Sequence, residues 1–584
     1  MLDKQINLFN VSTTAFLTKE EKKLNLPLTE KKRQLGELTK ELKMWKKFDT
    51  KLSTEDTRFV LGRIIDDIII CEQEVKELHK ITKKALKEKF AEALVAENKK
   101  IRKLDLSYVQ YKNAEGDIKP NMNNLISMFA SELSRTFKVA TNELTKDILV
   151  VDMFYYDLSR DLVVNGFDWG QRHFVYFSSS AGQIRKKKAV FVSERLWNKY
   201  QGRLMCGIDI DYINKCGGMN TNKFLAYLAL SNTASEQWET VFGKKFDIDR
   251  AVVVDDFETM VRGRADYIDC DTYLIKENCV DDFLIPHSDG SGLVCSEYSG
   301  RNFMIRLPFV KGLLCSFDFR RFCRENNVSK ITDIWGKEYD IFEDDVRFIL
   351  TKSQTKLNTS VFSSWQHYID NFKKNGCEAC VCNIEGSVVK NARLNYQMLQ
   401  NLDMADDEIS KLCERSNDKI KKISDSLENM LSIFGVRETS ELGEKQYFSR
   451  ALQIYPELLQ DVSNKTMLRE LKDSLVTKYK SGKIELRCSY HFVAPDLYAM
   501  CENIFLKIKE PEGLLKNNEV FCRKYRNVDK LDCLRSPALY REHPVRNNVC
   551  NKKYRNQKLS DWFKTDAIYT SCHDLISRVL QFDM

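Results

Sequence analysis

The densest group of cations in the sequence follows a series of small residues between two strand-like runs. It reads Ser178-Ser-Ser-Ala-Gly182-Gln183-Ile-Arg185-Lys186-Lys187-Lys188. Small residues let a backbone approach a phosphate closely, and the cations that follow can neutralise its charge. A basic turn that is simply solvated has the same pattern. The segment is therefore a candidate nucleic-acid contact through Gln183, Arg185, Lys186 and Lys188.

A second candidate is the strand-like run Phe303-Met-Ile-Arg306-Leu-Pro-Phe-Val-Lys311-Gly312, which follows the turn Ser288-Asp289-Gly290-Ser-Gly292. Asp-Gly supplies the positive φ angles of a hairpin turn, which is the simplest interpretation of that turn. A lysine that ends a strand before a glycine can reach into a cleft as a point charge. Such a charge suits a triphosphate or the charge that develops on a leaving pyrophosphate. Taken alone, Lys311 would be assigned to the surface.

One carboxylate stands out in the last stretch, Asp574-Leu-Ile-Ser-Arg578-Val-Leu-Gln-Phe-Asp583-Met584. The apolar run of Val579, Leu580 and Phe582 predicts a strand that carries Asp583 at its tip. A hard divalent cation such as Mg²⁺ prefers several carboxylate oxygens on one tight loop, so Asp583 can be one ligand of a metal site. The alternative is a surface aspartate at a frayed terminus.

Other chemistry has little support in the sequence. Seven histidines are spread too thinly for a histidine cluster, and there is neither a phosphate-binding Gly-x-x-x-x-Gly-Lys-Ser/Thr loop nor a Gly-x-Ser-x-Gly elbow. The segment Cys377-Glu-Ala-Cys380-Val-Cys382 has ligand-like spacing, but no second pair completes a zinc site. We therefore predict a buried strand there.

The composition predicts a globular protein of three or four domains, because 584 residues with 43% hydrophobic and 30% charged side chains can bury several cores. Lysine and arginine total 92 against 84 acidic residues, and this net charge of +8 permits a nucleic-acid partner without requiring one. Eighteen scattered cysteines and no secretory segment predict a reducing cytoplasm. No apolar run is long enough to cross a membrane.

Stretches with helical spacing alternate along the chain with stretches of short strand-like runs. Residues 17–102 predict helices with Leu35, Leu38 and Leu42 on one face, and the Lys- and Glu-rich opposite face is either solvated or a clamp on nucleic acid. From Asp105 to about Ile384, short β-branched runs predict strands at residues 173–177, 189–192, 251–254 and 303–306. Residues 394–480 return to helical spacing, and strands resume from Ile484.

The order of several short motifs resembles the RNA-dependent RNA polymerases of eukaryotic gene silencing and their single-chain phage relatives. The motifs are the basic turn with Gln183 and Arg185, the Asp-Gly-x-Gly turn, the strand with Arg306 and Lys311, Leu350-Thr-Lys352-Ser353-Gln-Thr-Lys356, Leu394-Asn395-Tyr-Gln397, Gly513-Leu-Leu-Lys-Asn-Asn-Glu519-Val-Phe521 and Cys533-Leu-Arg535-Ser536-Pro537-Ala-Leu-Tyr540-Arg541-Glu-His543-Pro-Val-Arg546. The last motif departs from the family, which often continues as Cys-Leu-His-Pro-Gly-Asp after Arg-x-Pro.

The resemblance implies an α+β fold with two double-psi β-barrels, the second incomplete. A helical region (1–104) would precede the first barrel domain (105–393), and a helical connector (394–483) would lead to the second barrel (484–584). The family carries an Asp-x-Asp-Gly-Asp metal loop, of which Asp583 would be the first residue. We therefore expect the sequence to stop inside that loop.

The resemblance also implies a function: an RNA-directed RNA polymerase-like nucleotidyltransferase that uses Mg²⁺, nucleoside triphosphates, a template and nascent RNA. It assigns Asp583 to the metal and Lys311 and Arg306 to the triphosphate, and it adds Lys356 to the catalytic residues of the first barrel. Arg185, Arg535, Arg541 and Arg546 would contact nucleic-acid backbones, and His543 would face a base, donate a proton or be structural.

Three alternatives stay open at this point. The template could be DNA. The protein could be a non-catalytic nucleic-acid-binding protein, or a split-polymerase subunit completed by a chain that carries the missing part. The expected compartment is the cytoplasm of a bacterial host or phage-infected cell.

Overall fold

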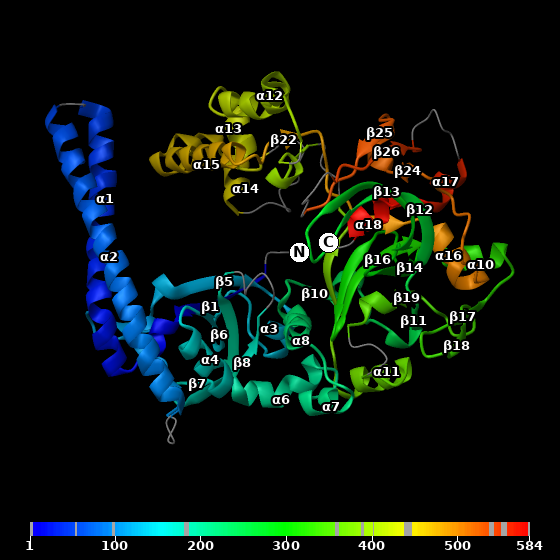
Figure 1. The fold of residues 1–584 in the computed structure, drawn as a ribbon, viewed down its shortest axis with the longest axis horizontal. Coiled ribbons are helices and arrows are strands. Elements are labelled where there is room, and N and C mark those ends of the chain that lie inside the picture. Colours follow the sequence, from blue (N-terminus) through cyan, green and yellow to red (C-terminus); the bar gives the residue numbers. More distant parts are fainter. Residues whose placement is uncertain are drawn as a thin grey trace. The chain divides into compact units, whose positions relative to one another are not determined.

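A computed structural model describes residues 4–52, 55–95, 100–179, 186–356, 361–386, 391–400, 402–436, 447–536, 542–550 and 557–581 (Figure 1). Its contacts divide the chain into two compact units. Unit 1 comprises Met1–Phe246, Ile305–Lys311 and Lys356–Cys382, and unit 2 comprises Asp247–Met304, Gly312–Thr355 and Asn383–Met584. The chain crosses between the units several times.

A pair of long helices dominates the first hundred residues of unit 1 (Figure 1). α1 (Lys19–Leu52) and α2 (Glu55–Val95) pack along each other, as the helical spacing predicts. Leu28 of α1 and Ile64 and Cys71 of α2 are buried, while the charged positions of both helices are mostly exposed. A strand that the sequence analysis did not predict, β1 (Gln5–Ser12), precedes this pair.

β1 belongs to a seven-stranded sheet with the order β2-β7-β8-β9-β6-β1-β5. It runs parallel to β6 (Leu144–Asp152) and antiparallel to β5 (Leu125–Phe129). β8 (Arg172–Ser178) and β9 (Lys188–Ser193) pair antiparallel, which confirms the two strands predicted on either side of the basic segment. The remaining strands are β2 (Arg102–Lys103) and β7 (Phe167–Trp169).

Helices and short strand pairs also belong to unit 1. The helices are α3 (Glu132–Thr136), α4 (Tyr156–Asn165), α6 (Glu194–Leu204), α7 (Ile210–Lys215), α8 (Thr221–Leu228), α9 (Trp238–Phe242) and α11 (Trp365–Lys374). β10 (Glu236–Gln237) pairs with β20 (Cys380–Ile384). Cys380 and Cys382 are buried in β20, which confirms the buried strand predicted around them.

Unit 2 contains two groups of four strands with the same chain order and polarity. The first strand module consists of β11 (Ala251–Val254), β14 (Ser291–Cys295), β16 (Val310–Phe317) and β19 (Phe348–Thr351), and the second of β23 (Val493–Pro495), β24 (Glu519–Phe521), β26 (Val545–Asn548) and β27 (Ile568–Thr570). In each, the first strand is parallel to the fourth, the fourth antiparallel to the second, and the second parallel to the third.

Both strand modules of unit 2 pack into one hydrophobic core. Leu293 and Ile349 of the first module share this core with Phe521 and Tyr569 of the second. α10 (Phe319–Glu325) and α16 (Leu497–Leu506) contribute further apolar side chains to it. The same strand pattern thus occurs twice along the chain, and both copies contribute side chains to one core.

Unit 2 also contains a long hairpin, short strand pairs and several helices. A long hairpin joins β12 (Glu258–Ile268) to β13 (Ile275–Pro286), and β25 (Lys530–Asp532) pairs with β26. The helices predicted after residue 394 are α12 (Asp406–Lys422), α13 (Leu427–Ile433), α14 (Tyr447–Ile454) and α15 (Val462–Lys480). β17 (Lys330–Thr332) pairs with β18 (Glu338–Asp340), and β21 (Ala392–Arg393) with β22 (Glu485–Leu486). In unit 1, β3 (Gln110–Lys112) pairs with β4 (Ile118–Pro120). α17 (Gln557–Trp562) precedes β27.

The strand predicted near residue 580 is wrong, because Ile576–Gln581 form the helix α18. Asp574 accepts a hydrogen bond from the backbone N–H of Ile576 at the start of this helix. Ile576 and Leu580, four residues apart, are both buried in the same small cluster. A short apolar run fits a strand or a helix equally well, and here the local cap and the i, i+4 burial favour the helix.

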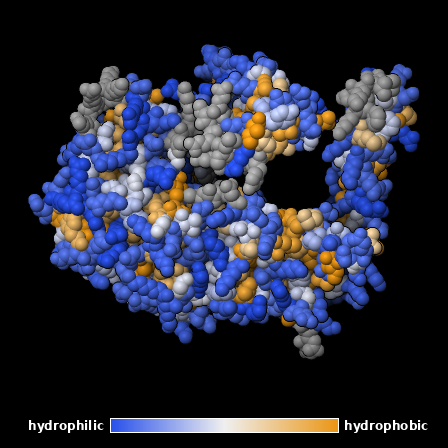
Figure 2. Space-filling model, turned by 180° about the vertical axis from the view of Figure 1, so that it is seen from behind, coloured by the Kyte–Doolittle hydropathy of each residue, from blue (hydrophilic) through white to orange (hydrophobic). Residues whose placement is uncertain are grey.

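The fold is thus mixed α+β with several sheets. Hydrophilic side chains cover most of the face seen in Figure 2, with hydrophobic ones scattered among them. In the part of the chain that the structure describes, no helix combines the length and the apolar character needed to cross a membrane.

Candidate nucleotide and nucleic-acid site

Three of the motifs singled out in the sequence meet in the first strand module. Gly290 of the Asp-Gly-x-Gly turn donates its N–H to Ser353 Oγ at 2.8 Å and accepts from the N–H of Leu313 at 2.8 Å. Gln354 Nε2 donates to the Leu313 carbonyl at 3.0 Å. Residues that are 23–63 positions apart in the sequence therefore form one hydrogen-bonded cluster. We call it the glycine cluster (Gly290, Gly292, Gly312, Ser353 and Gln354).

The glycines of this cluster are required by close packing of the backbone. A Cβ atom at Gly292 would lie 2.2 Å from the carbonyl oxygen of Ile349, and one at Gly312 would lie 2.3 Å from that of Gly290. Gly290 also has a φ of +67°, which side-chain-bearing residues rarely adopt. Backbone packing and backbone conformation therefore explain why glycine occupies these positions in both motifs. The turn predicted at Asp289-Gly290 is present.

An aspartate at the end of β11 fixes the cluster to the module. Ser353 Oγ donates to Asp256 Oδ1 at 2.6 Å, and the N–H of Ser353 lies 3.1 Å from Asp256 Oδ2. On the other side of the turn, Ser288 Oγ accepts from the N–H of Phe257 at 2.8 Å. The turn is thus joined to the ends of β11 and β19 by polar contacts that are largely shielded from water.

The three residues predicted to be catalytic lie around one tight turn of unit 1. β15 (Phe303–Leu307) and β16 are neighbouring strands connected by Pro308 and Phe309 alone. A two-residue connection sets Arg306 opposite Lys311, with their side chains on the same face. The backbone N–H of Lys356 donates to the Phe309 carbonyl at 2.8 Å, which brings the third residue to the same turn.

The guanidinium of Arg306 has a donor that an anion could use. Arg306 donates from Nη1 to its neighbouring Ile305 carbonyl at 2.7 Å. Its buried Nε has no hydrogen-bond acceptor among the residues that the structure describes. A phosphate group has the charge and the acceptor oxygens that this guanidinium could use.

The basic segment after β8 is described only in part. Gln183 and Arg185 lie outside the described residues. Lys186 is exposed. Lys188 lies at the start of β9, where its ammonium contacts Asp152 at 3.0 Å and donates to Asn10 Oδ1 at 2.8 Å. Of the described cations, Lys186 is therefore better suited to a phosphate than Lys188.

The Leu-Asn-x-Gln and Arg-Ser-Pro motifs contact each other in unit 2, although about 140 residues separate them. Asn395 Nδ2 donates to Ser536 Oγ at 2.9 Å, and Ser536 Oγ donates to Gln397 Oε1 at 2.9 Å. Arg535, predicted to contact a nucleic-acid backbone, directly precedes Ser536 in the loop between β25 and β26. This contact gives the two motifs a shared structural role.

His543 and Arg546 both have partners within the protein. His543 Nδ1 lies 2.8 Å from Asp532 Oδ2, and its buried Nε2 has no hydrogen-bond partner within the described ranges. Arg546 of β26 forms a buried ion pair with Asp574, with Nη2 2.6 Å from Oδ1. The predicted nucleic-acid roles of both residues remain predictions. Arg541 and Asp583 lie outside the described residues.

The sequence analysis missed a buried histidine at the edge of the Asp-Gly turn. His287 is fully buried, with Nε2 2.8 Å from Thr259 Oγ1 and Nδ1 2.9 Å from Ser577 Oγ. Burial lowers the pKa of its imidazole to about 4, so it is neutral near pH 7. Its place directly before the Ser-Asp-Gly turn is the only signal in the sequence, and it does not reveal partners that are 28 and 290 residues away.

No metal centre is complete within the described ranges, since they contain no group of three or more His, Cys, Asp or Glu side chains that could hold an ion. Carboxylates near the glycine cluster are instead engaged by protein donors, as Asp256 is by Ser353. The described residues therefore do not test the predicted role of Asp583.

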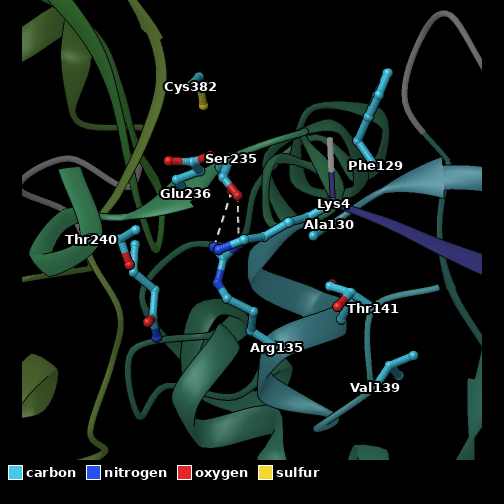
Figure 3. A pocket seen from close by; sticks show the side chains of 12 residues that line it. Lys4, Phe129, Ala130, Arg135, Val139, Thr141, Ser235, Glu236, Thr240 and Cys382 are labelled. Atoms are coloured by element: carbon cyan, nitrogen blue, oxygen red, sulfur yellow. Dashed lines mark hydrogen bonds between the residues drawn. The ribbon is translucent and has the colours of Figure 1, made fainter. Parts of the chain in front are cut away.

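A pocket of about 220 Å³ in unit 1 is lined by Lys4, Phe129, Ala130, Ser134, Arg135, Val139, Thr141, Ser235, Glu236, Gln237, Thr240 and Cys382 (Figure 3). Arg135 points into it but donates to the Ser235 carbonyl at 2.5 Å and to Glu378 at 2.6 Å. The Arg135 cation is therefore already paired with the Glu378 carboxylate.

Comparison with known proteins identifies the relationship. The chain is 38% identical over all of its 584 residues to the DNA-directed RNA polymerase YonO of Bacillus phage SPbeta. The chain is a homologue of this phage RNA polymerase. It spans 63% of the length of that relative. The expected similarity to a phage RNA polymerase is thereby confirmed along the whole of this chain.

A solved structure, the RNA-dependent RNA polymerase QDE-1 from Thielavia terrestris, matches 78% of this chain and 48% of its own with 13% identity and a TM-score of 0.42. No family model matches the chain.

Proposed function

We propose that this chain takes part in template-directed RNA synthesis as a nucleotidyltransferase, and that it contributes the side chains that hold the phosphates of the incoming nucleotide. The observation that carries this proposal is the meeting of separately weak motifs in the glycine cluster, combined with the 38% identity to a phage RNA polymerase. A chance set of turn motifs would have no reason to converge in space.

The repeated strand order of unit 2 supports two double-psi β-barrels. Each module pairs its first strand with its fourth in parallel, and its second with its third in parallel, around one antiparallel pair. Crossing parallel pairs of this kind are what interlocked psi loops require. The two modules are therefore the proposed cores of the two barrels.

Arg306 and Lys311 are proposed to bind the triphosphate, with Lys356 beside them. Template-directed synthesis joins a 3′-hydroxyl to the α-phosphorus and releases pyrophosphate, so negative charge develops on the leaving oxygens. Fixed cations next to those oxygens stabilise the transition state more than the ground state. Paired cations on a rigid strand turn suit this role better than cations on a mobile loop.

Magnesium and Asp583 complete the proposal. A divalent ion would neutralise charge on the reacting phosphates, and Asp583 is its proposed ligand. Nucleic-acid backbones are proposed to contact Lys186 and Arg535, together with Gln183, Arg185 and Arg541. The cytoplasm of a bacterial host or phage-infected cell, which holds template and nucleotides, is the proposed compartment.

DNA is the template that the relative's name favours, whereas the order of motifs alone favoured RNA. The test is incorporation of labelled nucleotides by the full-length polypeptide that carries these 584 residues, on matched single-stranded DNA and RNA of one sequence. Product that depends on template and on all four nucleoside triphosphates supports the proposal. Binding of both nucleic acids without any incorporation would instead support a non-catalytic binding protein or a polymerase subunit that needs a partner.

A further inference from the structure

A buried hydrogen-bond chain links the Asp-Gly turn to the helix that precedes Asp583. Thr259 Oγ1 donates to the Cys572 carbonyl at 2.7 Å and also lies 2.8 Å from His287 Nε2. On the other side of the imidazole ring, Nδ1 lies 2.9 Å from Oγ of Ser577, the second residue of α18. Thr259, His287 and Ser577 are all buried.

The hydrogen bonds of Thr259 indicate which ring nitrogen of the neutral His287 imidazole carries the proton. The single hydroxyl proton of Thr259 goes to the Cys572 carbonyl, so Thr259 must accept from His287 Nε2–H. A neutral imidazole then has an acceptor at Nδ1, and Ser577 donates to it. Both ring nitrogens therefore have a hydroxyl partner. The Ser577 hydroxyl also lies 3.3 Å from Thr570 Oγ1, a further buried hydroxyl.

The same face of the β12–β13 hairpin holds α18 by two further contacts. Gly263 of β12 packs against Leu575 so closely that a Cβ atom would lie 2.4 Å from Leu575 Cδ1. The Arg578 guanidinium lies over the Phe283 ring of β13, 5.9 Å from its centroid. Figure 1 shows α18 beside this hairpin. The imidazole thus adds hydrogen bonds to the packing contacts that Leu575 and Arg578 make with the hairpin.

From this arrangement we propose that His287 is a positioning residue for RNA synthesis, which holds α18 in a fixed relation to the Asp-Gly turn. The inference rests on the proposed function. The turn that follows His287 forms the glycine cluster, and α18 ends two residues before Asp583. A shift of α18 would therefore move the residues that follow it relative to that cluster, and misplacement by about 1 Å can cost roughly 100-fold in rate.

The test uses isosteric changes in the full-length polypeptide. Thr259→Val keeps the shape of the side chain but leaves both His287 Nε2–H and the Cys572 carbonyl without a partner, whereas Thr259→Ser keeps the hydroxyl. Ser316→Ala is the matched control, because Ser316 is a buried serine of unit 2 whose hydroxyl donates to the Ser299 carbonyl, away from α18. Amide hydrogen exchange of residues 578–580 and steady-state kinetics are measured for each variant.

Thr259→Val is expected to speed exchange in α18 by about tenfold and to lower kcat by about tenfold, with the KM for nucleotide within twofold of the wild type. Thr259→Ser should restore both, and Ser316→Ala should change neither. Equal exchange and kcat for Thr259→Val and Ser316→Ala in an active protein would overturn this inference alone. Absence of template-dependent synthesis by the wild type would overturn the proposed function, and with it the role assigned to His287.

Discussion

The carboxylate of Asp574 binds the guanidinium of Arg546 through both of its oxygens, and this pair joins the start of α18 to β26 of the second strand module. Asp574 is 4% exposed and Arg546 15% exposed at the side chain, so the pair is largely removed from water. The same carboxylate accepts from the backbone N–H groups of Ile576 and Asn518. The pair thus has a structural role that is independent of nucleic acid.

Removing one partner of this pair should therefore destabilise the fold. Arg546→Ala leaves the Asp574 charge buried without its cation, and the expected loss is about 3–5 kcal/mol of unfolding free energy. Arg172→Ala is the control, since Arg172 forms an exposed pair with Asp147 and should cost less than about 1 kcal/mol. Denaturant unfolding of both variants checks this. A loss below 1 kcal/mol for Arg546→Ala, with weaker template binding, would instead favour the nucleic-acid role.

His287 should make the protein sensitive to acid. Its folded-state pKa of about 4 lies below the value of 6.5 for an unperturbed histidine. Between these two values the unfolded chain binds a proton that the folded chain does not, so stability is full above about pH 6.5 and falls as the pH drops toward 4. His287→Gln should lose stability at pH 7 but show a shallower decline between pH 6.5 and 4. The unfolding free energy of both proteins is measured by urea unfolding at several pH values in this range. An equally steep decline with falling pH in His287→Gln and the wild type would contradict the lowered pKa of His287.

Glu132 should have the opposite pH dependence. It is fully buried in α3, and burial raises the pKa of its carboxyl from 4.5 to about 8. Because the unfolded chain ionises first, stability should be full below about pH 4.5 and fall as the pH rises toward 8. Glu132→Gln should be more stable than the wild type at pH 8, by about 2–4 kcal/mol, and nearly equal at pH 5. Thermal unfolding at the two pH values decides the matter.

The two described ends of the basic segment should differ in nucleic-acid binding. Exposed Lys186 is expected to neutralise one phosphate, so Lys186→Ala should flatten the slope of log K against log[salt] by about 0.7–0.9. Lys188→Ala should leave the slope unchanged, because that ammonium pairs with Asp152. Binding isotherms on a single-stranded oligonucleotide at four salt concentrations test both. An equal effect of the two changes would show that proximity to Asp152 does not matter.

The sequence predicted the local features best. The strands around residues 173–177, 189–192, 251–254 and 303–306 and the helices after 394 are present, because β-branched runs and 3.6-residue spacing report local burial. α18 was missed because six residues with two buried positions fit either period. His287 and its partners were missed because hydrogen bonds over 28 and 290 residues leave no trace in spacing. The sequence marked the motifs that contribute to the glycine cluster, but not the hydrogen bonds that join them, because those bonds link residues far apart in the chain.

The most direct measurement is single-turnover incorporation by Lys311→Ala in the full-length polypeptide, beside thermal unfolding and template binding. Lys311 lies opposite Arg306 at the β15–β16 turn. Removing one preorganised cation should raise the activation free energy of the chemical step by about 2–4 kcal/mol. Lys330→Ala serves as control, because Lys330 is exposed and paired with Glu338. A slow chemical step with normal melting and normal template affinity is the predicted result. A wild-type rate, or equal losses of melting temperature and activity, would contradict the account.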